Sequence, residues 1–145
     1  VSVLYWERRA ASMTLPVVFV ALVFLSSVSV GAWQFRLAGG SSVYGRLEAR
    51  RSASMPWGTV CASAFYSPVA QAACRSLGLS ANNAEYHRAP PALRGSASQP
   101  IAISVIERCP GDNARLQDCD LRDTGGCSHA DDIILCCASS ASKEF

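Results

Sequence analysis

Seven cysteines constrain this chain more than any other feature of its 145 residues. All of them follow the first 60 residues, at positions 61, 74, 109, 119, 127, 136 and 137. In an exported protein, which folds in an oxidising compartment, such cysteines form a disulfide framework. The length leaves room for one domain. An odd count leaves one thiol over, available for a second chain or for reaction.

Zinc ligation is the alternative use of these cysteines. The candidate ligands are Cys119, Cys127, His129 and either Cys136 or Cys137. Structural zinc sites usually contain a C-x2-C pair, and this sequence has none. Disulfides are therefore the favoured interpretation.

The N-terminal region has the three parts of a secretory signal. Arg8 and Arg9 precede an uncharged, largely apolar stretch from Leu15 to Val28. The small residues Val30-Gly31-Ala32 follow, at the positions that a signal peptidase reads. We therefore expect cleavage before Trp33.

Two other interpretations of the apolar stretch are an uncleaved membrane anchor and a buried core segment. The stretch contains Pro16 and is shorter than the ~20 residues that a membrane-spanning helix needs. We expect residues 1–32 to be a signal peptide, with Met13 as a possible start, and the mature protein to be secreted or held at the cell surface.

The charges are nearly balanced, with a net charge of +2, but they are unevenly distributed. The balance excludes strong disorder and gives no reason to expect nucleic-acid binding. Residues 33–108 hold eight arginines and three glutamates, whereas residues 109–145 hold three basic and seven acidic residues. Arg46, Arg50 and Arg51 form a candidate patch for polyanions, because arginine forks bind sulfate, phosphate and carboxylate oxygens. The alternative is an ordinary charged surface that pairs with the acidic half.

The pattern of the mature region is β-rich with one helix. Ser67-Pro68 can start a helix, and apolar residues then recur at spacings of three and four up to Leu77, before Gly78. Residues 80–100 contain prolines and small residues without periodicity, so we expect a long surface loop. The strand candidates are residues 35–37, 45–50, 57–61, 101–106 and 133–135.

Five segments, in order and in spacing, resemble the scavenger receptor cysteine-rich (SRCR) family. They are L-A-G-G-S from Leu37, G-R-L-E from Gly45, W-G-T-V-C from Trp57, A-C-R-S-L-G from Ala73 and C-S-H-A-D-D from Cys127. The resemblance covers about residues 36–138. We place an SRCR domain at residues 33–138 and a disordered tail at residues 139–145.

The resemblance implies an α+β fold in which a curved β-sheet cradles one α-helix. It implies the three disulfides of the six-cysteine group and places Trp57 beside the first of them. Because large aromatic side chains usually fill cores, we expect Trp57 in the core. The extra bridge of the eight-cysteine group would need partners near Val43 or Tyr44 and at Leu79, which are not cysteines. The implied pairs are Cys61–Cys127, Cys74–Cys137 and Cys109–Cys119.

This pairing leaves Cys136 as the odd thiol. Neighbouring residues on a strand point to opposite faces, so Cys136 faces out if Cys137 faces the core to meet Cys74. An outward thiol could form a disulfide-linked dimer. The alternatives are a capped or free thiol, or exchange between Cys136 and Cys137 as the partner of Cys74.

The resemblance also implies a function. Members are receptors or secreted proteins that bind polyanions, microbial surfaces or other proteins. Several hold a cation on two adjacent acids after the W-G-T-V-C cysteine and a third acid near the last motif. Here Ala62 and Ser63 replace the paired acids, and Asp131 and Asp132 remain. Calcium prefers several carboxylate oxygens, so at most a weak site is expected and no cofactor is assigned. The alternative for both aspartates is a solvated turn or a local hydrogen-bonding role.

Two rival classes remain. For an enzyme, the sequence offers no G-x-S-x-G, H-E-x-x-H or glycine-rich phosphate loop, and only His87 and His129 as histidines. A Cys–His nucleophile would need a free thiol, for which Cys136 is the only candidate. We expect no catalysis. The other rival is an unrelated small secreted disulfide-rich structural or defence protein, which would lack the five motifs.

Overall fold

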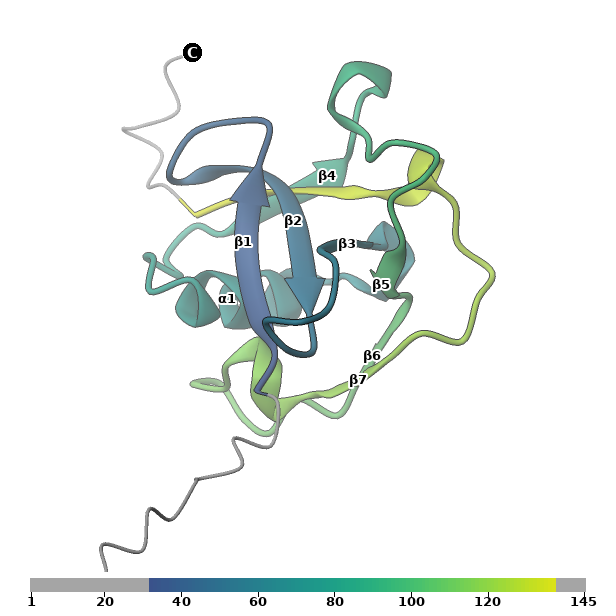
Figure 1. The fold of residues 1–145 in the computed structure, drawn as a ribbon. Helices are drawn as coiled ribbons and strands as arrows, with labels where there is room; N and C mark the ends of the chain where they lie inside the picture. Colours follow the sequence, from purple (N-terminus) through teal and green to yellow (C-terminus); the bar gives the residue numbers. More distant parts are fainter. Residues whose placement is uncertain (1–31, 138–145) are drawn as a thin grey trace, which may run out of the picture.

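In the computed structural model, which describes residues 32–137, a curved sheet curls around one α-helix (Figure 1). The α+β fold expected from the resemblance is confirmed. The expected tail, and residues 1–31 of the expected signal peptide, lie outside the described residues. The elements are β1 (Gln34–Ala38), β2 (Tyr44–Arg50), β3 (Gly58–Val60), η1 (Ala62–Ala64), α1 (Ser67–Ser76), β4 (Glu85–Arg88), η2 (Pro91–Leu93), β5 (Ile101–Ile103), β6 (Val105–Glu107), η3 (Leu116–Asp118), β7 (Asp120–Arg122), η4 (His129–Asp131) and β8 (Ile133–Cys136).

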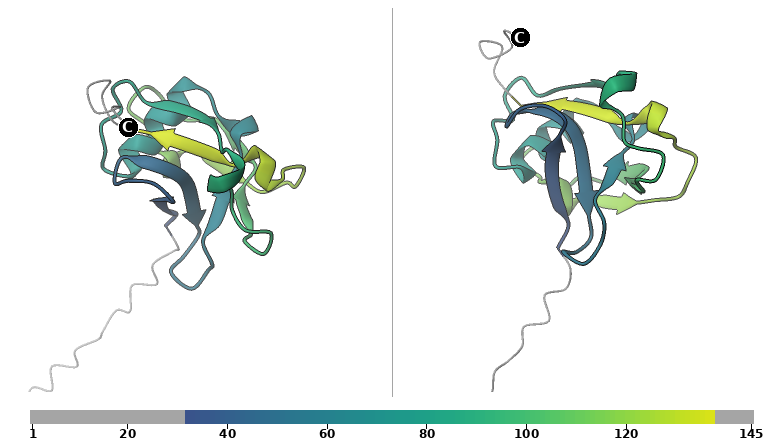
Figure 2. Two further views of the ribbon diagram at one scale, coloured as in Figure 1. Left: turned by 90° about the horizontal axis from the view of Figure 1, so that it is seen from above. Right: turned by 45° about the horizontal axis from the view of Figure 1, so that its top comes forward.

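Strand β2 organises the sheet. β1 pairs antiparallel with it along one edge, from Gln34 opposite Arg50 to Ala38 opposite Arg46. Two strands share the other edge of β2, since β8 pairs with its residues 44–46 and β3 pairs with its residues 48–49. β4 then extends the sheet beyond β8, and β5 runs parallel to β3. Two successive partners on one edge make the sheet a curled half-barrel, whose bend Figure 2 shows from two further sides.

The core lies between α1 and the inner face of the sheet. Leu47 and Ala49 point inward from β2 and are fully buried, as are Val69 and Ala73 on the apolar face of α1. The helix ends before Gly78, whose φ of +70° is the left-handed conformation that a C-terminal glycine adopts without strain. The expected amphipathic helix is confirmed. No helix within residues 32–137 is long and apolar enough to cross a bilayer.

Residues 80–100 are not one continuous loop, contrary to the expectation from sequence. Residues 85–88 form β4, which pairs antiparallel with β8. Of its four side chains only Tyr86 packs against the core, and the other three are exposed. An edge strand with one inward residue has too little alternation to be recognised from sequence.

The candidate strand at residues 101–106 is two strands in two sheets. β5 joins the main sheet, whereas β6 pairs only with β7. Ser104 separates them, and its N–H donates to the Arg122 carbonyl while its hydroxyl donates to Asp123.

Candidate ligand-binding face

Three disulfides connect distant parts of the chain, with sequence separations of 66, 63 and 10. One joins the end of β3 to the segment before η4, one joins α1 to the residue after β8, and one lies between β6 and β7. The bonded pairs are Cys61–Cys127, Cys74–Cys137 and Cys109–Cys119, the same pairs that the resemblance implies.

Cys136 is the free cysteine, and it is only 5% exposed. It does point away from the core, but the expectation that this side is open to solvent is wrong. β2 and β4 flank β8, and the rings of Tyr44 and His87 approach to 6.3 Å between centroids on that side. The thiol is therefore covered, and a disulfide to a second chain would require this cover to open.

The face of the sheet opposite α1 carries a buried carboxylate. Glu48 is 1% exposed and accepts hydrogen bonds from Arg36, Arg46 and the side-chain amide of Gln99 at 2.6–2.7 Å. Burial alone raises the pKa of this carboxyl. The hydrogen bonds from Gln99, Arg46 and Arg36 outweigh burial, so the pKa lies below its ordinary value of 4.5. Glu48 therefore remains ionised inside the protein.

Arg46 belongs to this buried network and is not an exposed patch residue. Its side chain is 14% exposed, pairs with Glu48, and donates from Nη1 to the carbonyl of Leu93 at 2.6 Å. The segment that contains Leu93 and Gly95 also contacts a second carboxylate, that of Asp132, which is fully buried. The Asp132 carboxylate accepts from the backbone N–H of Gly95 at 2.7 Å and lies 3.0 Å from Nδ1 of His129.

The two aspartates proposed for a cation are thus engaged by protein groups. Asp131 pairs with Arg88 at 2.6 Å and accepts from Ser128, while Asp132 has a local hydrogen-bonding role and is not in a solvated turn. Within residues 32–137 no group of three or more His, Cys, Asp or Glu side chains is arranged to hold a metal ion.

Trp57 lies on the outer face, and the expectation that it fills the core is wrong. Thr59 pairs with Glu48, so Trp57 falls beside Arg50 on the same face. Its ring is half-buried between two guanidinium groups, with Cζ of Arg36 4.4 Å and Cζ of Arg50 4.3 Å from the ring centroid. The strand register decides this position, and the motif alone does not reveal it.

Arg50 and Arg51 form no ion pair among the described residues, in contrast to Arg36 on β1 and Arg46 on β2. Arg50 donates only to neutral oxygens, at 2.6 Å to Gln34 and 3.2 Å to the Ala53 carbonyl. Arg51 is exposed, and its Cζ lies 5.0 Å from the ring centroid of Trp33. The Arg–Trp edge, as we name it, comprises Trp33, Arg50, Arg51 and Trp57. Two of the three arginines predicted for a ligand patch therefore remain available.

These features define a class of protein, a disulfide-linked α+β half-barrel with one helix and a partly exposed cationic, aromatic edge. The family model for the scavenger receptor cysteine-rich domain matches residues 37–138, and the chain belongs to that family. Domains of this family are typically non-enzymatic ligand-binding modules on the extracellular side of secreted or cell-surface proteins.

Two solved structures are similar to this chain. The third SRCR domain of murine neurotrypsin is 27% identical with a TM-score of 0.58, and the match covers 72% of this chain and 95% of that one. The dimeric form of the SRCR domain of mouse MARCO is 26% identical with a TM-score of 0.52, covering 71% and 93%. Both matches extend over nearly the whole of the other domain.

Proposed function

We propose that this chain is an extracellular binding module that recognises anionic ligands through the Arg–Trp edge. The observation that carries the proposal is the pair Arg50 and Arg51, which lie against tryptophan rings without an acidic partner among the described residues. Stacking restricts the side chains in advance, so less conformational entropy is lost when a ligand binds. The guanidinium forks then offer donors to sulfate, phosphate or carboxylate oxygens.

The proposed activity is binding alone. Arginine and tryptophan side chains at this edge supply donors and ring faces, and neither residue type serves as a nucleophile or a general base at neutral pH. We therefore propose no catalytic role for the domain.

The expected signal peptide bears directly on this edge. Cleavage before Trp33 would leave its α-ammonium group opposite Arg51, where it adds positive charge at neutral pH. Mass spectrometry of protein secreted by a eukaryotic host should find Trp33 as the first residue. Retention of the apolar stretch in the mature protein would contradict this part of the proposal.

Binding to immobilised dextran sulfate tests the proposed function. Replacing both arginines (Arg50→Gln with Arg51→Gln) should weaken binding about tenfold or more, because hydrogen bonds to charged groups contribute roughly 1.5–3 kcal/mol each. Added salt should weaken the wild-type interaction. The matched control removes two exposed arginines elsewhere, Arg108→Gln with Arg115→Gln, and should have little effect. Equal losses in both double variants would show that net charge, and not the Arg–Trp edge, binds the polyanion.

A further inference from the structure

A small hollow of about 120 Å³ lies beside the Arg–Trp edge. Pockets that enclose a whole drug-sized ligand measure roughly 300–1,000 Å³, whereas a cavity of about 150 Å³ accommodates a benzene ring. The hollow is therefore the right size for one side chain of a larger ligand. Its lining residues are Trp33, Arg50, Arg51, Met55, Pro56, Pro100, Ile101 and Ala102.

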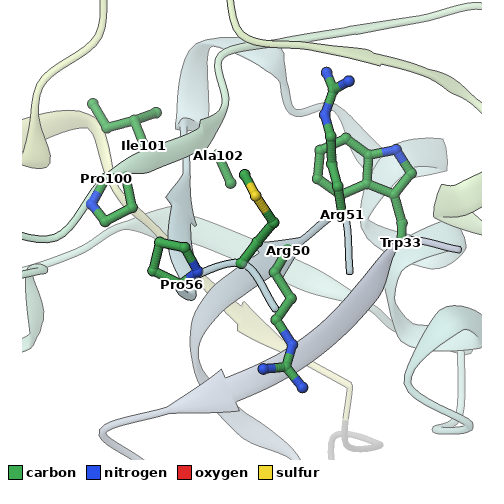
Figure 3. A pocket seen from close by; sticks show the side chains of 8 residues that line it. Trp33, Arg50, Arg51, Pro56, Pro100, Ile101 and Ala102 are labelled. Atoms are coloured by element: carbon green, nitrogen blue, oxygen red, sulfur yellow. The ribbon is translucent and has the colours of Figure 1, made fainter. Parts of the chain in front are cut away.

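The lining is apolar on one side and cationic on the other, and it includes no acidic residue. In Figure 3, Pro56, Pro100, Ile101 and Ala102 lie opposite Arg51, whose guanidinium is alongside Trp33. The guanidinium of Arg50 points away from that of Arg51, as expected for neighbours at the end of a strand. Arg50 therefore lines the hollow with its methylene groups, and Arg51 supplies the charge at its rim.

The apolar wall is held by the pairing of β3 with β5. The N–H of Thr59 donates to the Pro100 carbonyl at 2.9 Å, and the Gln99 side chain donates to the Trp57 carbonyl at 3.2 Å. Gly58 permits this approach, because a Cβ there would lie 2.8 Å from the backbone nitrogen of Ala102. The apolar wall of the hollow is thus fixed by backbone pairing and close packing.

We propose that this hollow makes the domain selective, among anionic ligands, for protein segments in which an apolar side chain neighbours a carboxylate. The apolar side chain enters the hollow, and the carboxylate pairs with Arg51. The proposal rests on the proposed function, since it uses the same Arg–Trp edge. A sulfated glycan can bind Arg51 but has no apolar group to fill the hollow, so its binding does not depend on the hollow.

Three blocked dipeptide probes test the selectivity: acetyl-Leu-Asp-amide, acetyl-Gly-Asp-amide and acetyl-Leu-Asn-amide. Titration into the 15N-labelled domain, followed by NMR, should show the leucyl-aspartate probe binding at least fivefold more tightly than either of the others. The largest shifts should fall on the backbone amides of Arg51, Ile101 and Ala102. Equal affinity for the leucyl and glycyl probes, or shifts confined to another surface, would overturn the inference.

Variants separate the hollow from the charge. Ala102→Leu fills the hollow and should remove the preference for leucine, while dextran sulfate binding remains. Arg51→Gln should weaken both interactions, and Arg115→Gln should change neither. If Ala102→Leu does not fold, Met55→Ser serves instead, because Met55 is an exposed wall of the hollow and its loss should reduce the preference. If the wild-type domain binds dextran sulfate but does not prefer the leucyl probe, this inference alone is overturned. If the wild-type domain binds neither dextran sulfate nor the probes, the proposed function is overturned.

Discussion

The two faces of β2 are both buried, but by different chemistry. On the inner face, Leu47 and Ala49 pack against α1 in an apolar core. On the outer face, Arg46 and Glu48 are covered by the chain that leads to β5, through bonds to Leu93 and Gln99. Apolar burial is non-directional, whereas a buried charge is tolerated only with specific partners. The outer face therefore depends on a few groups, each in a defined position.

This difference predicts how each face fails. Truncating an apolar residue removes contacts in proportion to the area lost, and neighbours partly relax into the space. Removing one member of a buried ionic network leaves the remaining charge without its partner, at a larger and less adjustable free-energy cost.

Breaking the inner face at its disulfide should have the largest effect. Cys74→Ala with Cys137→Ala removes a bridge with a sequence separation of 63, which in the chain-entropy model stabilises the fold by about 4 kcal/mol. Total stability of a domain is only about 5–15 kcal/mol, so the variant should unfold at much lower denaturant concentration. Denaturant titration without reductant measures this. The control, Cys109→Ala with Cys119→Ala, opens a loop with a separation of 10 and should lose about 3 kcal/mol. A larger loss from the short loop would contradict the entropic account.

Breaking the outer face at Glu48 should have the next largest effect. Glu48→Gln leaves Arg36 and Arg46 without their carboxylate and should destabilise the domain by about 3 kcal/mol. The pKa of Glu48 is lower in the folded state than in the unfolded state. Its stabilising contribution is therefore present above the ordinary pKa of 4.5 and is lost as the pH falls through the folded pKa.

The pH dependence of unfolding distinguishes this role from simple packing. The wild-type domain should lose stability as the pH falls below the ordinary carboxyl pKa of 4.5, and Glu48→Gln should reduce that loss. Glu107→Gln is the control, because Glu107 pairs with Arg122 at an exposed site where an ion pair contributes about 0–1 kcal/mol. If Glu48→Gln lost as much stability at low pH as the wild type, protonation of the buried carboxylate would not be the cause of the loss.

Asp131 and Asp132 are adjacent, but one carboxylate is partly exposed and the other is fully buried. Asp132→Asn disturbs the contacts with Gly95 and His129 and should cost about 2 kcal/mol, because a buried group loses a charged partner. Asp131→Asn changes only the half-exposed pair with Arg88 and should cost less than about 1 kcal/mol. Thermal unfolding of both variants measures the difference. Similar losses of stability in the two variants would mean that burial does not determine how much each aspartate contributes.

The inner face could be predicted from sequence because its signals are local. The alternation around Leu47 and the spacing from Val69 to Leu77 each lie within one element, and the family motifs supplied the overall fold. Even the position of Gly78 follows from a rule that needs no tertiary structure. These features are the ones that the structure confirms.

The outer face could not be predicted because its partners are far apart in sequence. Glu48 meets Gln99, and Trp57 meets Arg36, only after three strands have taken their register. Arg46 has the strand parity expected for a surface patch, yet the chain after β4 covers it. β4 itself carries one inward side chain, so nothing in its composition indicates a strand.

Cys136 and Cys137 are adjacent in sequence but lie on opposite faces of the sheet. Replacing Cys136 should cause only a small loss of stability. Cys137 is bonded to Cys74 in the core, whereas Cys136 is a buried thiol that pairs with Tyr44 across the sheet. Because a free cysteine behaves as a small apolar residue, Cys136→Ala should cost about 1 kcal/mol or less.

A maleimide should label wild-type Cys136 slowly in the native state and rapidly in denaturant, at a native rate set by local opening of the outer face. Because Glu48→Gln weakens the same face, it should accelerate native labelling more than Cys109→Ala with Cys119→Ala does. Rapid labelling of the wild type, or a disulfide-linked dimer on a non-reducing gel, would mean that the outer face opens freely and is not held closed by its charged network.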